Sequence, residues 1–235
     1  MNRKVDIDTE KVKTAIRTGI PISITTYTLP HDMEMYMGEI LSLFLTELNQ
    51  IHMIQYLTYS LNELVVNAKK ANTKRIYFKE KNLNIFDLND YNKGMKTFKN
   101  DTLNNINYYL KLQKDAGLYV RLILQVKNNN IIIEVRNNSK ITPFEKERIQ
   151  QKLEQAQQYE SIQDALTTVL DDSEGAGLGL VILILMLEKI GMTKENFQTI
   201  TNDTETITRI TLPLSEETQK EIDTISKEFS NAIQD

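Results

Sequence analysis

Gly175-Ala176-Gly177-Leu178-Gly179-Leu180 stands directly before the apolar run Val181-Ile182-Leu183-Ile184-Leu185-Met186-Leu187. The chain has eight glycines, and three of them fall in this stretch. The apolar run predicts a buried helix that ends before Gly191. A glycine-rich turn ahead of a helix N-terminus can bind phosphate through backbone N–H groups and the helix dipole. It can equally be a tight loop packed against a core helix, so the rest of the sequence must decide.

The composition excludes several kinds of site. The chain has 235 residues and a net charge of −4, whereas nucleic-acid-binding proteins usually carry a basic excess, so no nucleic acid is expected as a partner. Cysteine is absent, which excludes disulfides, thiolate catalysis and cysteine-ligated metals. Imidazole can come only from His31 and His52, so a histidine-built zinc site is not expected. The first residues lack the apolar core of a signal peptide, and the run 178–187 is too short for a bilayer, which predicts a cytoplasmic protein without a membrane partner.

Hydrophobic periodicity predicts one α+β domain over 1–235, with several strands on one side and helices on the other. The apolar residues of 31–71 recur at helical spacing and indicate two helices, or one bent helix that breaks near 49–52. Thr142-Pro143 combines a hydroxyl N-cap with proline at the first helical position and marks a helix start. The other expected elements are a strand at 21–29, a short strand at 73–79, a helix at 102–114 within an insertion at 81–116, a hairpin of 118–126 and 131–136, helical segments within 144–171, a hairpin of 197–201 and 204–212, and a terminal helix at 215–232.

Two polar groups of residues could bind a ligand. Glu63, Asn67 and Lys70 lie on one face of a helix, where a carboxylate and an amide oxygen suit Mg²⁺ and an ammonium suits phosphate. Taken alone, this face is more simply a solvated helix surface. Asn137-Asn138-Ser139 breaks a strand, where short polar side chains can hydrogen-bond a base or simply form a turn.

The order of these groups along the chain, over about 60–212, resembles the ATP-binding domain of the GHKL superfamily, and most closely its histidine-kinase-like branch. Residues 63–70 look like the N-box of that superfamily, 137–141 stand at its first glycine box, 140–174 look like its ATP lid, and 175–180 look like its second glycine box. The resemblance implies the Bergerat ATP-binding fold, a two-layer α/β sandwich in which helices cover one face of a mixed, mainly antiparallel sheet. It also implies ATP and Mg²⁺ as ligands.

The resemblance gives each matching residue a role. Asn67 would bind Mg²⁺, Glu63 would polarise a water or the acceptor as the catalytic residue, and Lys70 would contact phosphate. Gly175, Gly177, Leu178 and Gly179 would close over the phosphates. Asn137 and Ser139 would meet the base. The first glycine box departs from the family pattern Asp-x-Gly-x-Gly, because Asn137 replaces the aspartate and both glycines are missing. This departure weakens the case for turnover more than the case for nucleotide binding.

The resemblance implies a protein kinase or ATPase that transfers the γ-phosphoryl group to a partner protein in signalling. The alternative is a nucleotide-binding or protein-interaction module without turnover, and a third reading takes the three groups as coincidence. Neither His31 nor His52 has the sequence context expected of a phosphoacceptor, so the acceptor would lie on another protein. The helix within 32–60 could pair with a second copy of the chain or pack on its own sheet.

Overall fold

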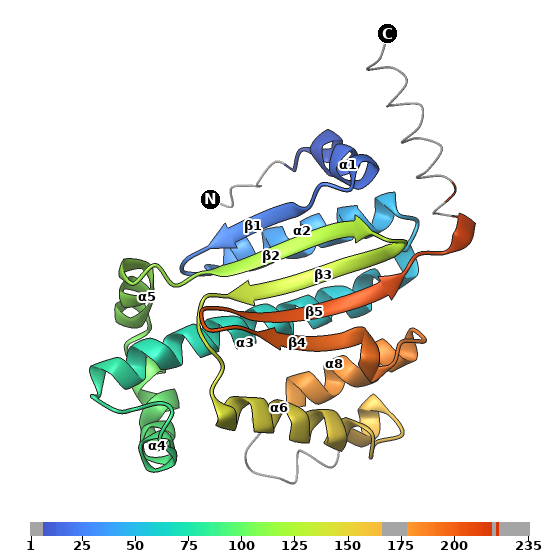
Figure 1. Ribbon diagram of the computed structural model, residues 1–235. Coiled ribbons are helices and arrows are strands. Elements are labelled where there is room, and N and C mark those ends of the chain that lie inside the picture. Colours follow the sequence, from blue (N-terminus) through green and yellow to red (C-terminus); the bar gives the residue numbers. More distant parts are fainter. Residues whose placement is uncertain (1–6, 166–177, 218–219, 221–235) are drawn as a thin grey trace.

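The computed structural model describes residues 7–165, 178–217 and 220. Within them, a five-stranded sheet is covered on one face by helices, as the α+β prediction requires (Figure 1). The strand order is β1-β2-β3-β5-β4, and every pairing is antiparallel, so the expectation of a mixed sheet was wrong for the described residues. The strands are β1 (Ile22–Thr26), β2 (Val120–Lys127), β3 (Asn130–Asn137), β4 (Phe197–Thr201) and β5 (Thr206–Pro213).

Both predicted hairpins are confirmed. The turn between β2 and β3 has Asn128 and Asn129 at φ +50° and +58°, the left-handed pair that a two-residue hairpin turn needs and that asparagine tolerates. The second hairpin joins β4 to β5 around 202–205. The strand expected at 21–29 forms as the shorter β1, which pairs with β2 at the edge of the described sheet.

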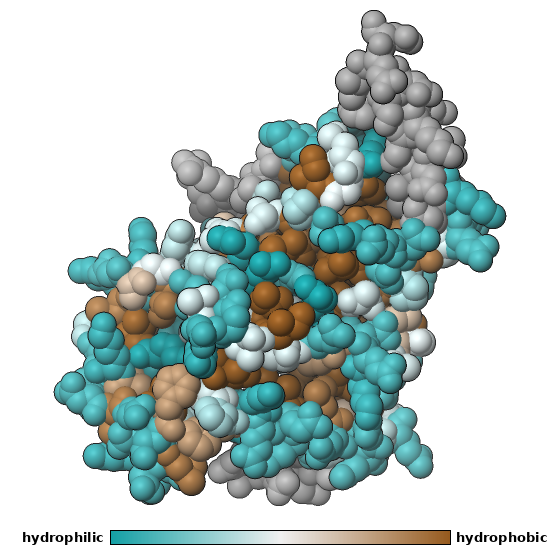
Figure 2. All heavy atoms as spheres, viewed as in Figure 1, coloured by the Kyte–Doolittle hydropathy of each residue, from teal (hydrophilic) through white to brown (hydrophobic). Residues whose placement is uncertain are grey.

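Alternation along the central strand separates the two faces of the sheet. Ile131, Ile133 and Val135 of β3 are almost fully buried in the main core. Glu134 lies on the other face, where its carboxylate accepts hydrogen bonds at 2.6 Å from Arg136 and from Arg209. Figure 2 shows apolar surface gathered around polar groups on this uncovered face. The face that carries no helix is therefore partly apolar, with its buried charge paired.

The longest helix, α3 (Ile54–Glu80), runs beneath the sheet and on to the insertion. The expected break near 49–52 is confirmed, because α2 (His31–Glu47) ends there and a short 3-10 turn, η1 (Ile51–Met53), precedes α3. The strand expected at 73–79 was wrong, since these residues are the last turns of α3. The run Ile76-Tyr77-Phe78 has strand-like composition, but the insertion wraps round the end of α3 and buries all three side chains.

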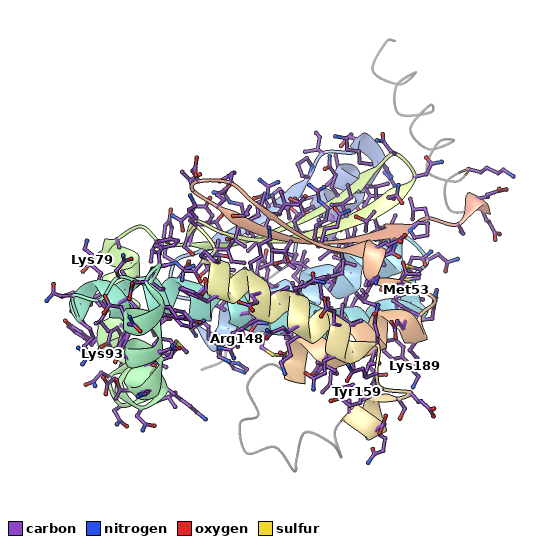
Figure 3. The ribbon with its side chains drawn as sticks, turned by 60° about the horizontal axis from the view of Figure 1, so that its bottom comes forward. Met53, Lys79, Lys93, Arg148, Tyr159 and Lys189 are labelled. Atoms are coloured by element: carbon purple, nitrogen blue, oxygen red, sulfur yellow. The ribbon has the colours of Figure 1, made fainter. Side chains whose placement is uncertain are left out.

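The insertion consists of α4 (Leu88–Asn104) and α5 (Ile106–Asp115), so the single helix expected at 102–114 was too short and spans the break at Asn105. The two helices form a second, aromatic core with the end of α3. A Cβ on Gly94 would lie 2.5 Å from Cζ of Phe78, so glycine lets α4 lie directly on that ring. In Figure 3, α3 runs from the side marked by Met53 to its last turn at Lys79, beside the insertion marked by Lys93.

Three further helices have both ends within the described residues: α1 (Thr9–Thr18), where no element was expected, α6 (Pro143–Ala156) and α8 (Leu178–Lys189), which is followed by a 3-10 turn, η2 (Lys194–Asn196). The predicted start of α6 is confirmed, with a capping box between Thr142 and Glu145. The buried helix and its glycine are also confirmed: α8 packs against α3 and α6, and Gly191 follows it at φ +78°. The terminal helix expected at 215–232 lies mainly outside the described residues. No helix of the part described here is both long and apolar enough to cross a membrane.

Candidate functional site

The three polar residues expected on one helix face all lie in the middle of α3. Asn67 and Lys70 are exposed, and Glu63 is half-buried. Their spacing of four and three residues places them along one line of the helix surface. Leu64, Val65 and Ala68 are buried in the main core on the opposite side. The polar face is therefore held in a fixed position by the packing behind it.

Gly179, the second residue of α8, meets this face. A Cβ built on Gly179 would lie only 1.6 Å from Oε2 of Glu63 and 2.5 Å from its Cδ. No side chain larger than hydrogen fits there while Glu63 keeps its position. The Glu63 carboxylate thus lies against the first turn of α8, where the positive end of the helix dipole favours an anion. Two motifs far apart in the sequence are adjacent in space.

The other members of the glycine stretch give less information. Gly175 and Gly177 lie outside the described residues, and Leu178 is the first residue of α8. The expected contact of these residues with phosphates stays a prediction.

Asn137 and Ser139 lie at the end of β3 and are buried against α3. The Asn137 side-chain amide donates to Oγ of Ser139 at 2.6 Å and to Oδ1 of Asn72 at 3.3 Å. The Ser139 hydroxyl donates to the same Oδ1 at 3.2 Å. The neighbouring Asn138 bridges the loop before β2, accepting from the Tyr119 backbone N–H and donating to the Gly117 carbonyl. The polar break after β3 therefore combines a turn with a buried network on α3.

A second connection ties α3 to the start of α6, the beginning of the expected lid. Arg75 donates two hydrogen bonds to the Glu145 carboxylate, at 3.1 and 2.6 Å, and Lys74 donates a third at 3.1 Å. Arg75 also reaches the Lys140 carbonyl at 2.5 Å. The side chains of Lys74, Arg75 and Glu145 are only 10–15% exposed.

The environment of Glu145 shifts its acidity strongly. Burial alone would raise the pKa of this carboxyl group, but the hydrogen bonds from Arg75 and the charges of Lys74 and Arg75 outweigh burial and lower the pKa to about 2. On α3, burial is the main cause that raises the pKa of Tyr59, and the nearby charge of Glu63 adds to it.

Sequence reasoning missed Asn72, Lys74 and Arg75, which are the residues that bind the candidate site to the lid and the strand end. The Thr142-x-x-Glu145 capping box was visible as a helix start, yet the partners of Glu145 lie 70 and 71 residues earlier in the chain. Because 73–79 was interpreted as a strand, the direction of Lys74 and Arg75 could not be anticipated.

The donor set suits magnesium better than a transition metal. No cluster of three or more Asp, Glu or His side chains that could hold a metal occurs in the described part of the chain. Mg²⁺ commonly keeps several waters and uses one or two protein oxygens together with phosphate oxygens. The exposed Asn67 and the adjacent Glu63 fit that requirement.

The lid start borders an open pocket. Its lining comes from the insertion, the 140–146 segment and the end of β4: Phe86, Lys140, Ile141, Thr142, Pro143, Lys146 and Thr201. Neither Glu63, Asn67 nor Gly179 belongs to it. In Figure 3, Arg148 marks α6, which begins within the 140–146 segment, and Tyr159 lies past the end of this helix.

The two histidines occupy peripheral positions. His31 is the first residue of α2, with its ring 3.7 Å from Glu34, and His52 is exposed in η1. Neither residue is among the partners of the α3 site.

Comparison with known proteins gives a relative of unassigned role. No family model matches the chain, and no solved structure matches it. An uncharacterized protein of Treponema pallidum (strain Nichols) is 47% identical over 232 residues, which is 99% of this chain and 45% of the relative. The chain thus spans less than half the length of the relative that it matches.

Proposed function

We propose that this chain binds Mg-ATP on the face of α3 that meets the N-terminus of α8. The observation that carries the proposal is the approach of Gly179 to Glu63, which leaves no room for a Cβ while Glu63 keeps its position and which brings the two expected nucleotide motifs together. The network of Asn137 and Ser139 ends on the same helix, two residues beyond Lys70. The phosphates would lie at the N-terminus of α8 and the base near the end of β3.

Charge supports a requirement for magnesium. A phosphate at the N-terminus of α8 would lie beside the Glu63 carboxylate, and two anions so close repel each other strongly. A cation between them offsets that repulsion. Asn67 supplies a neutral oxygen for Mg²⁺, and Lys70 supplies a further positive charge for phosphate.

The reaction that this arrangement would support is phosphoryl transfer from ATP to a partner protein. Magnesium would neutralise the developing charge, and Glu63 would orient or deprotonate the acceptor. Binding without turnover is the second candidate. It is favoured by the lid start, where both glycines of the first box are missing and the Arg75–Glu145 ion pair holds the chain to α3.

The proposal is tested by calorimetric titration of the chain with ATP, with and without Mg²⁺. We expect ATP to bind in the presence of Mg²⁺ and its affinity to fall at least about tenfold without Mg²⁺. This is the effect of leaving the repulsion between the phosphates and Glu63 without a cation to offset it. Absence of heat from ATP or ADP at millimolar concentration would overturn the proposal. Incubation with γ-labelled ATP then separates turnover from binding alone.

Replacement of Gly179 by alanine should change this magnesium dependence while leaving the fold intact. The new Cβ would occupy the position of the Glu63 carboxylate, so that flexible side chain must move away from α8. The affinity ratio with and without Mg²⁺ should fall by about tenfold, because the repulsion that Mg²⁺ offsets is reduced. Thermal stability should not fall, since alanine is favoured over glycine within helices by about 1 kcal/mol.

Gly38→Ala is the matched control for this prediction. Gly38 lies inside α2, and a Cβ there would meet only the Thr58 methyl group, at 3.5 Å. It should gain similar helix stability without any change in magnesium dependence. Equal behaviour of the two variants would show that the Gly179 position has no special relation to the ligand.

A further inference from the structure

We infer that the insertion binds the surface of a bilayer that carries anionic phospholipids. The surface concerned is the outer face of α4, the helix that Lys93 marks in Figure 3, and it shares no residue with the proposed nucleotide site. The expectation of no membrane partner stood on the lack of a segment that can cross a bilayer. Binding to a bilayer surface needs no such segment, since a helix with apolar and basic side chains can lie among the headgroups.

The outer face of α4 is basic. A helix turns by about 100° per residue, so Lys93, Lys96 and Lys99 point into one sector of about 120°. All three are exposed, and among the described residues no ion pair or side-chain hydrogen bond reaches them. The other α4 residues in this sector are also exposed and uncharged: Asn89, Asn92, Asn100 and Leu103.

The two acidic residues of α4 lie outside this sector and are already bound. Asp90 accepts from the Asn84 backbone N–H at 2.7 Å, and Asp101 pairs with Lys81 at 3.0 Å. The three outer lysines therefore share their face of α4 with no counter-charge. They form a local positive surface on a chain whose net charge is −4, and that surface is complementary to an anionic one.

Exposed apolar side chains are concentrated on the same part of the molecule. Leu88 and Leu103, near the two ends of α4, are 55% and 61% exposed. Figure 2 shows apolar and hydrophilic side chains interspersed over the insertion. Of the ten large apolar side chains that are exposed in the described part of the chain, five belong to the insertion: Phe86, Leu88, Leu103, Ile106 and Tyr108.

This combination favours a lipid surface over other polyanions. Lysines attract the headgroup phosphates, while the aliphatic side chains beside them need an apolar phase, which acyl chains offer and a sugar–phosphate backbone does not. A protein partner would have to be acidic and concave to follow the convex helix, whereas a bilayer is flat. Figure 1 shows the insertion at one end of the molecule, where a flat surface can approach it.

Co-sedimentation of the full chain with vesicles tests this inference. The chain should bind vesicles made of equal parts of phosphatidylcholine and phosphatidylglycerol, but not vesicles of phosphatidylcholine alone, and high salt should weaken the binding. The triple variant Lys93→Gln/Lys96→Gln/Lys99→Gln should bind the anionic vesicles about 100-fold more weakly. Each lysine near such a surface raises the affinity about fivefold, and the three contributions multiply.

The matched control is the triple variant Lys127→Gln/Lys146→Gln/Lys194→Gln. These lysines are exposed and lie outside the insertion, in β2, α6 and η2. The control loses the same total charge as the insertion variant, so a difference between the two depends on where the charge lies. It should bind the anionic vesicles as tightly as the wild-type chain.

A fluorescence measurement locates the contact without removing any charge. The chain has no tryptophan, so a single introduced tryptophan reports on its own position. The emission of Leu103→Trp should shift to shorter wavelength when anionic vesicles are added. Ile51→Trp is the control, because Ile51 is also 61% exposed but lies in η1, before the opposite end of α3, and its emission should not shift.

Four results would overturn the inference. They are no binding to anionic vesicles, an equal loss of binding in the two triple variants, equal emission shifts at positions 51 and 103, and binding to a duplex DNA oligonucleotide that is tighter than vesicle binding and is lost in the insertion variant. In the last case the lysines would serve a nucleic acid. All of these measurements are made without ATP, so failure of the proposed nucleotide site leaves them unaffected.

Discussion

Replacement of Glu145 by alanine is expected to lower the free energy of unfolding by about 3–5 kcal/mol, the range found when one partner of a buried ion pair is removed. The Glu145 side chain is 10% exposed and accepts from Lys74 and from both terminal nitrogens of Arg75. Without it, two positive charges stay in a nearly dry environment without their counter-charge. The variant also loses the capping box with Thr142, which by itself stabilises a helix start by about 1 kcal/mol. Thermal or urea denaturation at pH 7 measures the loss.

The pH dependence of this ion pair isolates its charge. In the folded chain the pKa of Glu145 is lowered to about 2 from its ordinary value of 4.5. Folding therefore favours the ionised form of this carboxyl group. Its contribution is complete above about pH 4.5 and disappears as the pH falls towards 2. A difference of this size corresponds to about 3 kcal/mol. We therefore expect the stability gap between the wild-type chain and Glu145→Gln to be large at pH 7 and to shrink steadily below pH 4.5.

Glu147→Ala is the control for both experiments. Glu147 lies two residues further along α6, is exposed, and accepts only a 3.4 Å hydrogen bond from Gln151. Its removal should change stability by no more than about 0.5 kcal/mol at any pH. If the stability of Glu145→Gln and of Glu147→Ala changed in the same way with pH, the charge of Glu145 would contribute nothing to stability. The buried ion pair would then not stabilise the fold.

Local patterns predicted the elements that local chemistry specifies. The Asn128-Asn129 turn, the Thr142-Pro143 helix start and Gly191 each have a backbone requirement that only certain residues meet, and all three were correct. The segment 73–79 failed for a non-local reason. Its Ile-Tyr-Phe triplet favours a strand by composition, but the aromatic core supplied by α4 and α5 buries it in helical form.

The order of the candidate site's motifs along the chain could be predicted from the sequence, but the contacts that join them to distant segments could not. The spacing of Glu63, Asn67 and Lys70 was enough to place them on one helix face, and the glycine stretch was enough to place a helix N-terminus. The contact between Gly179 and Glu63 is consistent with that reasoning. Asn72 and Arg75 could not be found in the same way, because their partners lie in distant segments whose packing no local pattern describes.

The structure explains why so many of these groups gather on α3. Along this helix, Glu63 meets α8, Asn72 meets the end of β3, Lys74 and Arg75 meet α6, and Tyr77 with Phe78 meets the insertion. One rigid helix thus fixes the spacing between all parts of the proposed site. We expect a disturbance of α3 to affect ligand binding and stability together, whereas a side chain that projects freely from it should affect binding alone.

Asn67 is such a side chain, and Asn67→Ala is expected to abolish binding of Mg-ATP, with a loss of at least about 100-fold in affinity. Its amide oxygen is the neutral donor proposed for Mg²⁺, and without it the cation that separates the phosphates from Glu63 loses one of the two oxygens that α3 would supply. The Asn67 side chain is exposed, so its removal leaves no cavity. Alanine is the better helix former, so thermal stability should be unchanged or slightly higher.

The matched control is Asn62→Ala, on the same helix and also exposed. Five residues of an α-helix turn through about 500°, so Asn62 points about 140° away from Asn67. It should show the same small gain in stability and the wild-type affinity for Mg-ATP by calorimetry. If Asn67→Ala bound Mg-ATP as tightly as Asn62→Ala, the exposed amide of Asn67 would not be a magnesium ligand. The α3 face would then be a solvated helix surface, and the nucleotide proposal would lose its metal site.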